Sequence, residues 1–208
     1  MSFLNATDLV FELRFKRCHK DAPAIVIGKS PWVEDDMRAV NRAVPTAVRI
    51  GVNDSAGRWH CDYSPWLDVN VKDHLLPGVL HVCQDTPTFR AIFDGKDALV
   101  NFFTSPPDLP PGSGKFNNVW PRPWGCITYT SMLAIWLAWY MGCRPVFIAG
   151  IDCRTREGRW YDDRDVSAEQ YVHLTQTMPD NRDGVFRLTE AMEADDVPVV
   201  WYGRNRDA

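Results

Sequence analysis

The sequence lacks several features that would assign it to a specialised class. None of its six cysteines forms a C-x-x-C pair, which argues against a zinc site or a disulfide framework and favours a reducing, cytoplasmic compartment. A net charge of −4 argues against a nucleic-acid partner held by phosphate neutralisation. Residues 1–20 carry charges throughout and contain no apolar signal-peptide core. What is present is an ordinary globular composition, with 45% hydrophobic residues in a chain of 208.

One segment comes close to the length of a membrane span. Residues 125–143 contain no charged side chain. However, Thr128, Thr130 and Ser131 lie near its start, so continuous apolar sequence runs only from Met132 to Met141. A span requires about 20 apolar residues. The segment therefore predicts a central helix packed against a sheet, and no membrane span.

Short apolar runs alternate with helical patterns along the chain. The predicted strands are 24–28, 47–52, 66–71, 79–83, 99–103, 146–151 and 197–202, and the predicted helices are 31–44, 88–93, 125–141, 168–177 and 184–194. This alternation is typical of a parallel sheet with helices on both faces. We expect one α/β domain over residues 1–208, a Rossmann-like three-layer sandwich with a mostly parallel sheet. Residues 105–123 hold six of the fifteen prolines and predict a long functional loop.

Polar or glycine residues follow three of the predicted strands. The first strand ends at Gly28, the second runs into Asn53 and Asp54, and the sixth ends at Asp152. In parallel sheets, ligands bind beyond the carboxyl ends of the strands, where the strand order reverses. The sequence therefore predicts that these strand ends gather around one pocket.

The turn Gly28-Lys29-Ser30 joins a predicted strand to a helix. Its free amides suit a phosphate or ribose oxygen and Lys29 adds a positive charge, but an ordinary turn fits equally well, since neither G-x-G-x-x-G nor a Walker A motif is present. Asn53 and Asp54 suit a base or ribose edge, or simple turn chemistry.

The predicted central helix and the strand after it carry further candidates. Thr128, Thr130 and Ser131, beside Tyr129, suit an anion site or ordinary capping. Asp152 suits a ribose hydroxyl, a metal or a turn, because burying it without a partner is costly. His173 suits general acid or base chemistry, although a lone histidine is more often a packing residue.

Two motifs resemble bacterial sialyltransferases of the Campylobacter type and the related family of motility-accessory-factor glycosyltransferases and archaeal hydroxymethylpterin diphosphokinases. One is Thr130-Ser131, an alanine-containing helix, Gly142 and the strand that ends in Gly150-Ile151-Asp152. The other is the first glycine turn, 27–31, which is similar to the Gly-x-Gly-Pro-Ser pattern of both groups. The order of elements agrees over roughly residues 22–202.

The resemblance implies a transferase that holds a nucleotide at the first glycine turn, Asn53 and Thr130-Ser131. It also implies that His173 is the base for the acceptor hydroxyl and that Tyr161 or Tyr171 assists the departing phosphate. The nucleotide-sugar donor is then a substrate, and no cofactor is required. One alternative is a pterin-type diphosphokinase or nucleotidyl transferase with Mg²⁺ near Asp152. Another is a non-catalytic nucleotide-binding protein. The acceptor is unknown, and a homo-oligomer remains open.

Overall fold

The computed structural model describes residues 6–67, 75–103, 129–153 and 168–204, with the backbone alone for 168–177. In chain order the elements are α1 (Ala6–Phe15), β1 (Ala24–Ile27), α2 (Val33–Ala43), β2 (Val48–Gly51), α3 (Ser55–Arg58), β3 (Tyr63–Trp66), β4 (Leu80–Gln84), α4 (Pro87–Phe93), β5 (Leu99–Phe103), α6 (Thr130–Tyr140), β6 (Val146–Ala149), α7 (Ala168–Ala194) and β7 (Val199–Trp201). The proline-rich stretch 105–123 lies outside the described residues.

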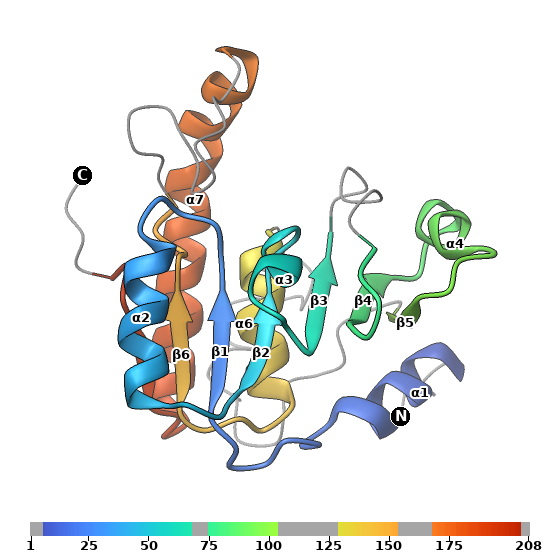
Figure 1. Cartoon of the computed structure of the whole chain (residues 1–208), viewed down its shortest axis with the longest axis horizontal. Coiled ribbons are helices and arrows are strands. Elements are labelled where there is room, and N and C mark those ends of the chain that lie inside the picture. Colours follow the sequence, from blue (N-terminus) through green and yellow to red (C-terminus); the bar gives the residue numbers. More distant parts are fainter. Residues whose placement is uncertain (1–5, 68–74, 104–128, 154–167, 205–208) are drawn as a thin grey trace.

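The strands form one seven-stranded sheet in the order β5-β4-β3-β2-β1-β6-β7. Every pairing in it is parallel. In Figure 1, α2 and α3 cover one face of the central strands, and α6 and α7 cover the other. The predicted Rossmann-like α/β sandwich is therefore confirmed, and the sheet is parallel throughout its described strands.

Strand β1 shows how the two faces are built. Its four residues are all buried, as the unbroken apolar run predicts for a strand covered on both sides. Successive side chains point to opposite faces, so Ile25 and Ile27 pack with Val33 and Met37 of α2. Val26 faces the other way, into the larger core around α6. Because alternate side chains point to opposite faces, the single apolar run of β1 contributes to two separate cores.

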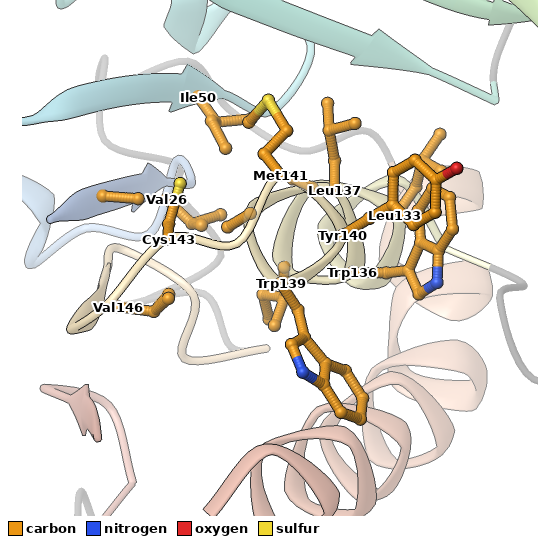
Figure 2. Close-up of a cluster of buried hydrophobic side chains, with 14 of the residues drawn as sticks. Val26, Ile50, Leu133, Trp136, Leu137, Trp139, Tyr140, Met141, Cys143 and Val146 are labelled. Carbon is orange, nitrogen blue, oxygen red and sulfur yellow. The ribbon is translucent and has the colours of Figure 1, made fainter. Parts of the chain in front are cut away.

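Helix α6 is the centre of the larger core. Every residue from Thr130 to Tyr140 is buried. In Figure 2, Leu137 and Met141 face the strand that carries Ile50, and Trp139 points toward a neighbouring helix. The helix ends at Gly142, whose φ of +79° is a left-handed cap conformation. The all-apolar segment is therefore a buried helix, as predicted; among the described residues, no helix has the length and apolar character needed to cross a membrane.

Two predicted elements differ from the structure. The helices predicted at 168–177 and 184–194 are one continuous helix, α7, which contains Pro179. A proline removes its own backbone hydrogen bond and its ring crowds the carbonyl four residues earlier, but Val185, Leu188 and Met192 bury the following turns in the core.

The strand predicted at 66–71 instead ends at Trp66 and begins at Tyr63. Pro65 obscured it, because proline is rare in central strands. Strand β2 pairs with β3 only at Ile50 and Tyr63, so Pro65 lies beyond the last pairing on that side. Residues 68–71 of the prediction lie outside the described part of the chain. Helix α1 had no counterpart in the sequence prediction.

Candidate functional site

The strand order reverses at β1. From β1 the chain adds β2, β3, β4 and β5 in one direction, and then places β6 on the opposite side of β1. Because all strands are parallel, the turns after β1, β2 and β6 meet at the same edge of the sheet. This is the position at which open α/β sheets bind ligands. The structure therefore brings together Gly28, Asn53 and Asp152, as predicted from the sequence.

The turns after β1 and β6 contact each other directly. A Cβ placed on Gly28 would lie 2.2 Å from the carbonyl oxygen of Gly150, so only glycine fits there. The amide of Ser30 donates to the same oxygen at 2.9 Å. The Ser30 hydroxyl donates to Asp152, whose side chain is fully buried. Ser30 and Asp152 thus bind each other.

A carboxylate from α2 holds the turn after β6. Asp36 is 2% exposed, and its Oδ2 accepts from the Gly150 amide at 2.9 Å. Gly150 has a φ of +65°, a conformation that favours glycine. In the sequence, Asp36 is one of three carboxylates in the first turn of α2, where the positive end of a helix favours them. Asp35, the preceding residue, lies in the same helical turn, so only the tertiary contact with Gly150 distinguishes the two carboxylates.

The turn after β2 is different. Asn53 is half-buried and has a φ of +55°. Its side-chain oxygen is buried, and it has no hydrogen-bond partner in the described part of the chain. Next to it, Lys29 Nζ lies 3.4 Å from Asp54 Oδ1. The predicted cation and carboxylate therefore neutralise each other across β1 and β2.

The start of α6 lies beside the turn after β6. Tyr129 and Cys153 both pack against the larger core. Burial raises the pKa of Tyr129, and the negative charge of Asp180 raises it further. The Ser131 hydroxyl donates to Asn181 Oδ1 of α7 at 2.8 Å. Tyr129, the N-cap residue, makes no side-chain cap bond. The first amides of α6 are thus at the same edge as Asp152.

Arg182 of α7 joins this edge to the end of the chain. Its guanidinium donates to the carbonyl oxygens of Asp152 at 3.1 Å and Gly203 at 3.2 Å, and to that of Arg204 at 2.8 Å. Arg182 was not identified as a site residue from the sequence. No local pattern distinguishes this arginine, which follows Asn181 on a long helix.

Four predicted residues are not positioned in detail. Thr128 and Tyr161 lie outside the described residues. Tyr171 and His173 are on α7, within the turns for which only the backbone is described. Figure 1 shows that these first turns of α7 project past the carboxyl edge of the sheet. The predicted roles of all four stay predictions.

The described residues contain no group of three histidine, cysteine, aspartate or glutamate side chains that could hold a metal ion. Asp152, the residue predicted to lie near Mg²⁺, accepts a hydrogen bond from Ser30, and the prediction of Mg²⁺ there stays a prediction.

No protein-family model and no curated protein matches the chain. Among solved structures, it is similar to a MAf glycosyltransferase from Magnetospirillum magneticum AMB-1, with 15% sequence identity and a TM-score of 0.45. The match covers 74% of this chain and 29% of that protein, so the chain spans less than a third of its length. A likeness this weak carries no argument about activity. The resemblance to sialyltransferases finds no support in these comparisons.

Proposed function

We propose that this chain is a glycosyltransferase-like enzyme that binds a nucleotide-activated sugar at the carboxyl edge of its sheet. The observation that carries the proposal is the buried side-chain oxygen of Asn53, which has no partner among the described residues. A buried acceptor without a hydrogen bond costs about 1–3 kcal/mol. A ligand that donates to it, such as a ribose hydroxyl or a base amino group, recovers that energy on binding.

The surroundings of Asn53 support a nucleoside phosphate. Asn53 follows β2, the immediate neighbour of β1, where the strand order reverses. At the same edge, the first amides of α6 at Thr130 and Ser131 are available to an anion, because a helix leaves its first four N–H groups without internal partners. The proposal therefore assigns the nucleoside to the Asn53 turn and the phosphates to the start of α6.

The proposed reaction transfers the sugar to an acceptor hydroxyl. The imidazole of His173 takes the proton of that hydroxyl, and the acceptor oxygen bonds to the anomeric carbon. The bond from this carbon to the donor phosphate breaks, and the phosphate leaves with the electron pair. Tyr161 or Tyr171 donates a hydrogen bond to the departing phosphate. The projection of the first turns of α7 beyond the sheet edge supports these roles for Tyr171 and His173 (Figure 1).

Among the described residues, the surroundings of Asp152 give no direct support for a Mg²⁺ site. Asp152 accepts from Ser30, and no cluster of three candidate ligands surrounds it in the described part of the chain. We therefore derive no step through Mg²⁺, and the pterin-type diphosphokinase remains an outcome of the test below.

A second candidate is a nucleotide-binding protein without turnover. The bond between Ser30 and the fully buried Asp152 favours it, because this bond gives Asp152 a structural role at the turn. The two candidates share the nucleotide site and differ in the role of His173.

The binding experiment compares CMP-, UDP- and GDP-sugars with ATP, with and without Mg²⁺, by thermal shift and calorimetry. We expect one nucleotide-sugar to bind without Mg²⁺. Asn53→Gly keeps the left-handed turn and removes the acceptor, and should weaken binding about tenfold without lowering stability.

Asp196→Gly is the matched control. Asp196 also has a positive φ, +61°, but precedes β7 at the opposite edge of the sheet. This variant should bind the nucleotide like the wild type. If Asn53→Gly also binds like the wild type, or if no nucleotide binds, the proposed site is wrong. Mg²⁺-dependent binding of ATP alone would favour the diphosphokinase.

The second experiment measures turnover in His173→Ala. Under the transferase proposal, release of the free nucleotide from the donor falls at least a hundredfold while donor binding stays nearly intact. Nucleotide binding with no turnover in the wild type, across a panel of acceptors, would favour the non-catalytic candidate.

A further inference from the structure

Helix α1 is apolar on two opposite faces. Phe11 is buried against Trp136 and Tyr140 of α6, and Phe15 is buried against Phe11 and Tyr63. With 3.6 residues per turn, Leu13 lies on the side of α1 away from these two phenylalanines, and Val10 lies one turn before it. Leu13 is 78% exposed and Val10 is 56% exposed. The outer face of a helix on a globular domain is ordinarily polar, so this face requires an explanation.

Four basic side chains follow the exposed pair, at the end of α1 and in the segment after it. Arg14, Lys16, Arg17 and Lys20 are all exposed. Over residues 12–21 they outnumber the only two acidic residues, Glu12 and Asp21, although the whole chain carries a net charge of −4.

The acidic neighbours neutralise only part of this charge. Lys16 pairs with Glu12, and Lys20 lies 4.0 Å from Asp21. Arg14 and Arg17 have no side-chain ion pair with any described residue. The end of α1 and the segment that follows it therefore combine two exposed apolar side chains with an excess of positive charge.

We infer that the exposed Val10 and Leu13, together with the basic side chains of Arg14, Lys16, Arg17 and Lys20 that follow them, bind the surface of an anionic lipid bilayer. Aliphatic side chains that enter the acyl boundary, flanked by Lys and Arg at the headgroups, are the features by which a helix lies on a membrane. Charge complementarity selects anionic lipid.

Other partners fit this face less well. A stable protein partner buries about 800 Å² on each side and prefers a core of aromatic side chains depleted in lysine. At the end of α1, the two exposed aliphatic side chains are instead accompanied by four basic side chains. A nucleic acid would use the charge but not Leu13 and Val10. A shallow, partly electrostatic contact with lipid uses both features.

This inference is independent of the proposed transferase site. The segment after α1 joins the amino edge of the sheet, where the amides of Arg17 and His19 donate to the carbonyl oxygens of Tyr140 and Met141 at the end of α6. The nucleotide site is proposed at the opposite edge. Failure of one proposal therefore leaves the other standing.

The test is co-sedimentation of the full chain with vesicles of phosphatidylcholine, with and without phosphatidylglycerol. We expect binding only to the anionic vesicles, and its loss at high salt, because screening removes the charge attraction. The double variant Val10→Ser/Leu13→Ser should bind about tenfold more weakly, since two side chains no longer enter the bilayer. Arg14→Gln/Arg17→Gln should also lose about tenfold or more.

Two controls keep the test specific. Val200→Ser removes another exposed aliphatic side chain, 42% exposed on the edge strand β7, and Arg38→Gln removes an exposed arginine of α2. Both should bind like the wild type. Because Val10 and Leu13 are exposed, their variants should keep the wild-type melting temperature.

Three results would overturn the inference. The first is equal or absent binding to both vesicle types by the wild type. The second is unchanged binding in both double variants. The third is a dimer of the wild type in solution that Val10→Ser/Leu13→Ser converts to a monomer without any vesicle binding, which would assign the face to a second copy of the chain.

Discussion

The two sides of β1 are built differently at the carboxyl edge of the sheet. On the β6 side, Gly28, Ser30 and Asp36 all bond to or contact the turn at Gly150. On the β2 side, Asn53 has a buried oxygen with no partner among the described residues. The first side is closed by its own contacts and the second is incomplete. One edge of the sheet therefore combines turns that bond to each other with a neighbouring turn whose buried acceptor needs a ligand.

The largest expected loss of stability comes from a substitution on the β6 side of β1. In Gly150→Ala a new Cβ would lie 2.5 Å from Val33 Cγ2 and would also require a left-handed alanine. We expect a loss of about 3 kcal/mol or more in the free energy of unfolding, measured with urea.

Gly95 provides the matched control for this substitution. Its φ is also +65°, but nothing lies within 4 Å of the added Cβ. Gly95→Ala should therefore show only the backbone cost of about 1 kcal/mol. Equal losses in the two variants would mean that the packing between β1, α2 and β6 is not tight.

A smaller effect is expected from Asp36→Ala. It leaves the buried Gly150 amide without its charged acceptor and should destabilise the protein by about 2 kcal/mol. Asp35→Ala serves as the control, because Asp35 is 67% exposed and pairs only with Arg38. Asp35→Ala should lower the free energy of unfolding, measured with urea, by less than about 0.5 kcal/mol. Indistinguishable losses would contradict the role of Asp36.

The smallest effect on stability is expected at His81 of β4, a second buried side chain with a polar atom that has no hydrogen-bond partner in the described part of the chain. Its side chain is fully buried beside Trp66 and Phe93, and its Nε2 accepts from the Leu76 amide at 3.3 Å. Burial lowers its pKa. The folded protein thus favours neutral His81.

This lowered pKa sets the direction of a pH effect. The stability from neutral His81 is complete above the unfolded pKa, near 6.5, and decreases as the pH falls through that value toward the folded pKa. The slope from one histidine is at most about 1.4 kcal/mol per pH unit. Urea denaturation between about pH 7.5 and about pH 5 should show this decrease, and His81→Gln should remove it.

His81 also sharpens the comparison with Asn53. Both residues carry a buried polar atom without a partner in the described part of the chain, but only Asn53 is at the edge where the strand order reverses. His81→Gln should therefore leave nucleotide binding unchanged. A loss of binding as large as that in Asn53→Gly would show that the effect is indirect.

Local sequence predicted most of the fold. Apolar runs such as 24–28 and 146–151 identified buried parallel strands, and the uncharged segment before Gly142 identified the central helix. Where a residue's local preference conflicted with its tertiary surroundings, prediction failed. Pro65 obscured β3, and the expected break between 177 and 184 does not occur in α7.

By itself, the sequence determined the alternation of strands and helices and the polar residues at the strand ends, because side-chain periodicity and turn chemistry are local properties. Only the tertiary structure decided that Asp36 holds Gly150, that Asp152 binds Ser30 and Arg182 binds the Asp152 carbonyl, and that the Asn53 oxygen is buried without a partner. These contacts join residues far apart in the chain. Their partners are set by sheet order and helix packing, which no single segment encodes.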